Sequence, residues 1–149
     1  MKKIIVSACL LGERCRFDGL SKPNEHVIAL KNRFELIPVC AEELGGLKTP
    51  RPPAEIVGNR VVRVDGVDVT KEYKKGAQCV LKIATDNNCK IAVLKARSPS
   101  CGSGFIYDGT YTKTLKEGNG ICAQLLIDNG ILVLDERSLE RINYEDNSE

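Results

Sequence analysis

The sequence predicts an α/β fold, a single domain with a mainly parallel sheet and helices on both faces. Two observations support this prediction. Short runs rich in β-branched residues alternate with amphipathic helical stretches, and each run is apolar almost throughout. A strand that is apolar on both sides is buried on both faces, as in a parallel sheet between two helical layers. The length of 149 residues fits one domain whose core needs no disulfide bonds.

The amino-terminal part of the chain is expected to form two strands around one helix. Residues 2–7 are a short β-branched run, expected to be a buried strand. Apolar residues at helical spacing predict a helix over residues 23–33, with Asn24 as its N-cap. The run over residues 34–40 predicts the second strand, which ends at a cysteine.

The middle of the chain alternates irregular and helical patterns. Glycine and proline dominate residues 41–56, which are expected to be a structured loop. An Asp65–Gly66 pair between β-branched runs predicts a hairpin at the edge of the sheet or outside it. The longest helical pattern covers residues 70–88, with Thr70 as the expected cap.

The carboxyl-terminal part is expected to add a third and a fourth strand. The third strand covers residues 90–96 and is followed by a second turn signal. A helix closed by Gly130 leads to the fourth strand over residues 131–136. The alternating elements together describe a Rossmann-like domain over residues 1–142, and the polar residues 143–149 are expected to be a tail.

Charge and hydropathy exclude several classes of partner. The net charge is only +2, from 22 basic and 20 acidic residues with no dense basic run, so no nucleic-acid polymer is expected. No apolar stretch approaches the roughly 18 residues of a membrane span. The amino terminus lacks the cleavage pattern of a signal peptide. We therefore expect a cytoplasmic protein that does not bind membranes; the oligomeric state stays open.

The seven cysteines are the most informative feature of the sequence. Their number is odd, and a cytoplasmic chain of this size favours metal binding or thiol chemistry over disulfides. Cys9 lies just after the first strand, Cys40 ends the second, and Cys101 lies in the loop after the third. Because open parallel sheets bind ligands at the carboxyl ends of their strands, these three thiols are expected to line a site there.

Three converging thiolates suit zinc or an iron–sulfur cluster. A structural zinc site usually has four ligands, often in CxxC pairs, and the sequence contains no such pair. A 4Fe–4S cluster is usually held by four cysteines, so three would leave one iron open to a substrate. Cys15, between Arg14 and Arg16, is a reactive thiol or a spare ligand, because arginines favour a thiolate. Three unrelated thiols are the plainer alternative.

The loop after the second strand also carries polar groups. Glu42 follows Cys40 by two residues and is therefore expected to lie beside the metal site. A carboxylate in such a place can act as a general base toward water. Its plainer role is that of an acidic residue in the first turn of a short helix. Arg51, between two prolines, is suited to grip a phosphate or carboxylate, or else to pair with a loop glutamate.

The loop after the third strand supplies hydroxyl groups and flexible backbone. Ser98 and Ser100 flank a proline, and Gly102 allows backbone N–H groups to approach an anion or a cluster sulfur. An ordinary Ser/Gly/Pro turn is the alternative. The expected substrate contacts are Arg51, Ser100 and Gly102.

These motifs together resemble the thiouracil desulfidase family. The matching pieces are SACLLGERCRFDG, PVCAEELGGLKTPRPPAEI, DVT before the long helix, and LKARSPSCGSG. They occur in the family's order and span most of residues 4–123, and their combination is far more specific than any one of them. One departure is Ala41, where the family commonly has proline; this change alters loop rigidity but removes no chemical group.

The resemblance implies a hydrolase-like, non-redox enzyme that removes sulfur from thiolated uracil or its nucleotide. It implies a 4Fe–4S cluster with one open iron, held by Cys9, Cys40 and Cys101. Such a cluster is expected to be lost or replaced in protein purified in air. The resemblance further implies Glu42 as the base and Ser98 as a proton donor or orienting group.

Two other interpretations stay open. The same thiols would suit a non-catalytic module that binds zinc or senses oxidants through Cys15 and Cys9. A nucleotide-binding domain without metal is weaker, because ACLLGERC follows the first strand where a Gly-x-Gly-x-x-Gly turn would be needed. The sequence also leaves open whether the substrate is a free base, a nucleoside monophosphate or another thioamide.

Overall fold

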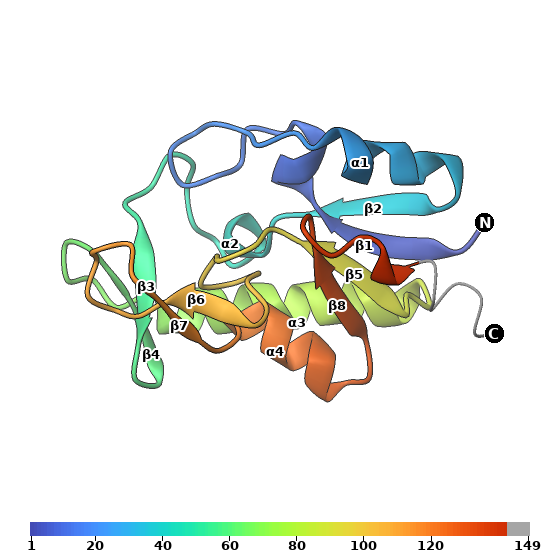
Figure 1. Ribbon diagram of the computed structural model, residues 1–149. Coiled ribbons are helices and arrows are strands. Elements are labelled where there is room, and N and C mark those ends of the chain that lie inside the picture. The colour runs from blue at the N-terminus through green and yellow to red at the C-terminus, as the bar shows by residue number, and fades with distance from the viewer. Residues whose placement is uncertain (143–149) are drawn as a thin grey trace.

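Four parallel strands form the central sheet of the computed structural model, which describes residues 1–142 (Figure 1). Their order across the sheet is β2-β1-β5-β8, and all three pairings are parallel, which confirms the predicted fold class. The predicted tail at residues 143–149 lies outside the described residues, so the domain boundary stays a prediction. The strands are β1 (Lys3–Ser7), β2 (Glu35–Val39), β5 (Ile91–Leu94) and β8 (Leu132–Asp135).

Helices cover both faces of this sheet, as predicted. In Figure 1, α1 lies over one face, and α3 and α4 lie over the other. Each face has its own core of buried apolar side chains, because the central strands present such side chains to both sides. No helix within residues 1–142 is long and apolar enough to cross a membrane. The α-helices are α1 (Glu25–Ile28), α2 (Ala41–Leu44), α3 (Thr70–Asp86) and α4 (Ile121–Asp128).

The two predicted helix caps have different outcomes. Asn24 caps α1, since its side-chain oxygen accepts the Val27 N–H at 3.1 Å. Helix α1 is short, and the chain continues as the 3₁₀ helix η2 (Ala29–Asn32). The prediction for Thr70 is wrong, because Thr70 is already the first helical residue. Its N–H is bound by the side chain of Asp68 at 2.8 Å.

The prediction of a loop over residues 41–56 is also wrong in part. The segment contains helix α2 and strand β3 (Ala54–Val57), which pairs with β4 (Arg60–Arg63) in an antiparallel hairpin. This hairpin turns at Gly58, whose φ of +64° suits glycine. The predicted Asp65–Gly66 turn lies just after β4. It folds the chain back onto β4, where Asp68 and Val62 form an isolated bridge and no further strand.

Two small hairpins lie beyond the carboxyl ends of the central strands. One is the β3–β4 pair, and the other joins β6 (Phe105–Tyr107) to β7 (Leu115–Glu117). Figure 1 shows both on the side of the molecule toward which the central strands point. The chain thus places its irregular segments around the sheet edge where parallel α/β folds bind ligands.

Candidate functional site

The carboxyl ends of the central strands carry the predicted thiols. The chain leaves β1 for β2 on one side and later enters β5 on the other, so the direction of winding switches between β1 and β5. Cys9 lies in the 3₁₀ helix η1 (Ala8–Leu11) directly after β1. Cys40 follows β2 as the N-cap of α2, and Cys101 lies in the loop after β5. All three thiols are therefore at one edge of the sheet.

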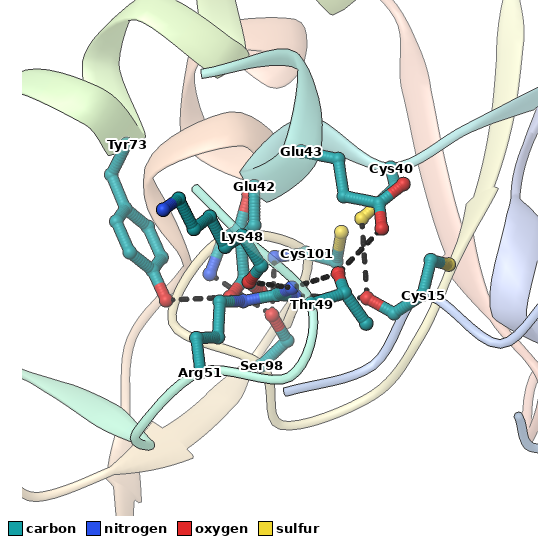
Figure 2. Close-up of polar contacts among 11 residues, drawn as sticks. Cys15, Cys40, Glu42, Glu43, Lys48, Thr49, Arg51, Tyr73, Ser98 and Cys101 are labelled. Carbon is teal, nitrogen blue, oxygen red and sulfur yellow. Dashed lines mark hydrogen bonds and ion pairs between the residues drawn. The ribbon is translucent and has the colours of Figure 1, made fainter. Parts of the chain in front are cut away.

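A fourth thiol joins them. Cys15 is only 4% exposed, and its side chain is within hydrogen-bonding reach of the side chains of Cys9 and Cys40. The Cys40 thiol also donates to the carbonyl oxygen of Cys15 at 3.7 Å (Figure 2). We call the side chains of Cys9, Cys15, Cys40 and Cys101 the thiol site.

Burial and mutual contact raise the pKa values of these thiols. Contact with Cys40 lowers the pKa of Cys15, but contact with Cys9 and burial outweigh it and raise the pKa to about 12. The expectation that the flanking arginines favour a Cys15 thiolate is therefore wrong, because burial among other thiols decides its pKa. The Cys15 contact and burial raise the pKa of Cys40 well above its usual range. Burial raises the pKa of Cys101 to about 12 against the effect of a contact with Ser7. Metal binding here would therefore release protons, since thiolates are the ligands.

The remaining cysteines lie outside the thiol site. Cys89 precedes β5 at the opposite edge of the sheet, where its charged neighbours are Lys3 and Glu35 at the starts of β1 and β2. Cys79 is on α3, and Cys122 is completely buried on α4. None of these three thiols is therefore counted in the thiol site.

The Ser98 side chain shapes the loop that carries Cys101. Its Oγ accepts the N–H groups of Ser100 and Cys101, both at 3.0 Å. The N–H of Gly102 is bound by the carbonyl of Ser98 at 2.8 Å, so it is not free for an anion. A Cβ at Gly102 would lie 2.8 Å from that same oxygen, which explains the glycine.

The same loop is anchored on the first turn of α4. The carbonyl of Ser100 accepts the N–H groups of Cys122 at 2.9 Å and Ala123 at 3.0 Å, which otherwise lack partners at a helix start. The Ser100 hydroxyl oxygen is buried next to the Cys101 thiol, whose pKa it lowers, and no nitrogen or oxygen atom among the described residues pairs with it. The loop therefore holds Cys101 rigidly and places a hydroxyl beside it.

Glu42 is the central carboxylate near the thiol site. It lies on α2, two residues after Cys40, and its side chain is 16% exposed. Its Oε1 accepts a hydrogen bond from Arg51 Nε at 3.0 Å and another from the Tyr73 hydroxyl at 2.8 Å (Figure 2). Oε2 has no hydrogen-bond partner within residues 1–142, so one oxygen of the carboxylate is held and the other is left free.

Arg51 connects three parts of the site. Besides Glu42, its guanidinium donates to the carbonyl of Cys15 at 3.0 Å and to that of Lys48 at 3.1 Å. It also donates to the Thr49 hydroxyl at 2.7 Å. Burial lowers the pKa of Arg51, but the neighbouring Glu42 carboxylate outweighs this and raises it, so Arg51 keeps its charge. The pairing with a loop glutamate, one of the two interpretations of Arg51, is present.

Glu43 points to a different partner, although it adjoins Glu42. Its carboxylate accepts the Thr49 hydroxyl, which in turn receives Arg51 (Figure 2). The two acidic residues of α2 are therefore both tied to the segment that ends at Arg51. Among the described residues, the Glu42 carboxylate accepts a hydrogen bond from the long helix α3, and the Glu43 carboxylate accepts none from it.

Tyr73 is the residue of this site that the sequence analysis missed. It lies on α3, and it is only 3% exposed. Burial, and then the nearby Glu42 carboxylate, raise its pKa well above the usual range, so the phenol stays protonated. Its spacing to Ala77, Val80 and Ala84 marks it as one more residue of the apolar helix face, and a buried tyrosine hydroxyl requires a partner. The need of this hydroxyl for a buried partner was the sequence signal that could have identified Tyr73 as part of the site.

A pocket of about 310 Å³ adjoins this group of residues. It lies between the segment after α2, the β4 strand and the start of α3. The two side chains that hold Glu42, Arg51 and Tyr73, are part of its wall. Lys48 adds further positive charge, and Arg63, which pairs with Asp65, also lines the pocket, so the pocket is suited to a small ligand with an anionic group.

The ligand types present fit an iron–sulfur cluster, because cysteine thiolates are its usual ligands and four thiols gather here. Within residues 1–142, no three His, Cys, Asp or Glu side chains are arranged as ligands of a single metal ion.

Comparisons with known proteins agree with this geometry. A family model described as 2-thiouracil desulfurase matches residues 4–138. The uncharacterized protein YbbK of Bacillus subtilis (strain 168) is 40% identical in an alignment 149 residues long that covers 93% of this chain and 99% of that protein. The solved structure of the 4Fe–4S-dependent thiouracil desulfidase TudS is 42% identical, with a TM-score of 0.92 and 97% of each chain covered.

Proposed function

The chain belongs to the 2-thiouracil desulfurase family, and on this premise we propose that it is a desulfidase that removes sulfur from a thiolated uracil. One structural observation carries the proposal: the thiol site and the half-buried Glu42 carboxylate, of which one oxygen is hydrogen-bonded, lie together at the switch point of the sheet. The similarity to TudS along nearly the whole chain supports the same activity. A cytoplasmic location, where thiols stay reduced, accompanies the proposal.

We propose that Cys9, Cys40 and Cys101 hold a 4Fe–4S cluster. They come from three strand ends, and the loop carrying Cys101 is fixed by Ser98 and by α4. When bound, the cluster supplies an iron with an open position that attracts the sulfur of the substrate. Cys15, which reaches both Cys9 and Cys40, is the alternative ligand.

Glu42 is proposed as the general base. The reaction is a hydrolysis, in which water supplies the oxygen that replaces sulfur on the ring carbon, and the sulfur leaves as sulfide. No electrons are gained or lost overall. The free Oε2 of Glu42 is the atom that takes the proton from the attacking water, because Oε1 is occupied by Arg51 and Tyr73.

Ser98 is proposed as a proton donor or orienting group. Its oxygen accepts two backbone N–H groups, and its own proton remains available to donate. Ser100 is a proposed substrate contact because its hydroxyl lies beside the Cys101 thiol and pairs with no nitrogen or oxygen atom among the described residues. Gly102 is proposed to act through its backbone alone: because it has no side chain, the loop that carries Cys101 can fold closely next to the substrate.

The pocket lined by Lys48 and Arg63 favours a nucleotide as the substrate. Arg51, already bound to Glu42 and three other groups, forms its inner wall. A thiouracil base at Glu42 would direct an attached ribose phosphate into this pocket, where the cations would bind the phosphate. We therefore expect a lower KM for thiouridine monophosphate than for thiouracil, and Lys48→Ala should raise only the KM of the nucleotide.

Anaerobic reconstitution with iron and sulfide tests the whole proposal. The protein should become brown, bind about four irons per chain, and release sulfide from thiouracil or its nucleotide. A colourless product without iron would contradict the assignment. Neither result depends on which thiolated pyrimidine is preferred.

A second candidate is a zinc-binding or oxidant-sensing module without catalysis. The contacts of Cys15 with the neighbouring thiols favour its thiol-pairing form, whereas no three ligands within residues 1–142 are arranged for zinc. This candidate predicts stoichiometric zinc after purification in air and no turnover of any thiolated base. Cys15→Ser separates the two. A sensor would lose its response to peroxide, whereas a desulfidase whose ligands are Cys9, Cys40 and Cys101 would keep its iron and its activity.

A further inference from the structure

The carboxylate of Glu42 is held from one side only. Arg51 Nε and the Tyr73 hydroxyl donate to the same oxygen, Oε1, at 3.0 and 2.8 Å. No donor among residues 1–142 binds Oε2. The side chains of Arg51 and Glu42 are 7% and 16% exposed, and Tyr73 is 3% exposed, so water competes little for these bonds.

From this arrangement we infer that Tyr73 is a positioning residue for the desulfidase reaction: its hydroxyl, together with Arg51, fixes Oε1 of Glu42 so that Oε2 faces the reacting water. The inference rests on the role of base proposed for Glu42. Tyr73 itself is not proposed to touch the substrate. It acts through the orientation of the carboxylate.

The direction of the two hydrogen bonds supports this role. A guanidinium can only donate, and the Tyr73 hydroxyl donates here. Both bonds therefore persist whether Oε2 carries a proton or not. Glu42 can accept a proton and return it without moving, which is the property that a preorganised general base needs.

The position of Tyr73 is itself rigid. It lies in the first turns of α3, and its ring packs in the small core formed by the β3–β4 hairpin and Ile106. Helix α2, which carries Glu42, packs closely against α3 at Gly45 and Gly76. The distance between the phenol and the carboxylate is thus set by the packing of two helices and not by a flexible loop.

Tyr73→Phe removes only the hydroxyl and is the direct test. In the reconstituted enzyme we expect kcat to fall about 10- to 100-fold, as for other small losses of alignment, with KM nearly unchanged. The iron content and the affinity for the product uracil, measured by calorimetry, should stay the same. In crystals of the variant, Glu42 should lose its single orientation.

Tyr111→Phe is the matched control. The Tyr111 hydroxyl binds the carbonyls of Val62 and Arg63 in the β3–β4 hairpin and makes no hydrogen bond to Glu42, so its loss should lower stability but leave kcat unchanged. A normal kcat in Tyr73→Phe would overturn the inference, and so would a loss of activity that parallels a loss of iron. If Glu42→Gln is fully active, the base itself is misassigned; if it is inactive while Tyr73→Phe is normal, only the inference fails.

Discussion

Gly76 lies so close to Ala41 that a Cβ atom on the glycine would be 1.8 Å from the alanine carbonyl oxygen. Gly76 is in the middle of α3, and Ala41 is the first residue of α2. Gly45 makes the reciprocal contact, since its Cβ would be 2.0 Å from the carbonyl oxygen of Glu72. The two missing side chains let the short helix touch the long one, and this contact brings Glu42 within reach of Tyr73.

Gly76→Ala is therefore expected to destabilise the protein, by about 1–3 kcal/mol in urea unfolding, because backbone must move to admit the methyl group. Helix propensity alone predicts the opposite sign, a gain of about 1 kcal/mol. The sign of the change thus tests the contact. Gln78→Ala, on the exposed face of the same helix, should change stability by no more than about 0.5 kcal/mol.

Replacement of each proposed ligand by serine should abolish iron binding. We expect Cys9→Ser, Cys40→Ser and Cys101→Ser to remain colourless after anaerobic reconstitution, as measured by iron analysis and visible absorbance. Cys79→Ser is the control, because Cys79 lies on α3 outside the thiol site. Retention of a full complement of iron by any of the three ligand variants would remove that cysteine from the proposed set.

Glu42→Gln should keep the iron but lose about 100- to 10,000-fold in rate, which is the usual cost of losing a general base. Glu43→Gln is the matched control, since its carboxylate accepts a hydrogen bond only from Thr49 among the described residues. Sulfide release and iron content, measured side by side, separate a catalytic loss from a loss of the cluster. A slow Glu43→Gln and a normal Glu42→Gln would transfer the role to Glu43.

The Asp135–Arg137 pair predicts a pH dependence of stability. Burial raises the pKa of Asp135, but hydrogen bonds from Arg137 at 2.8 Å outweigh it, so the pKa lies below its usual value. The ionised carboxylate therefore stabilises the fold above its unfolded pKa of about 3.9, and this contribution is lost as the pH falls through the folded value.

Arg137→Gln should accordingly cost about 1 kcal/mol at pH 7, because the arginine side chain is half exposed and water weakens the pair. The difference from the parent protein should shrink in urea unfolding at about pH 3. An equal difference at both pH values would show that the ion pair contributes nothing to stability.

The sequence correctly predicted the central sheet and the sheet edge at which Cys9, Cys40 and Cys101 lie. Apolar runs such as that of β5 alternate with helical patterns, and this order requires a parallel sheet covered on both sides. The positions of Cys9, Cys40 and Cys101 at strand ends then follow from the direction of the strands. The sequence did not predict α2 and β3, because the glycines and prolines around them favour turns. In the structure, packing against α3 and pairing with β4 outweigh this local preference.

The periodic part of the protein follows from its amino-acid order alone: the strands, the covering helices and the edge to which they bring three thiols. The partners of each side chain at that edge depend on tertiary packing. Cys15 reaches Cys40 from 25 residues away in the chain, and the Tyr73 hydroxyl reaches Glu42 from 31 residues away. Such contacts leave no period in the sequence, because they depend on how closely two backbones approach, and here two glycines set that approach.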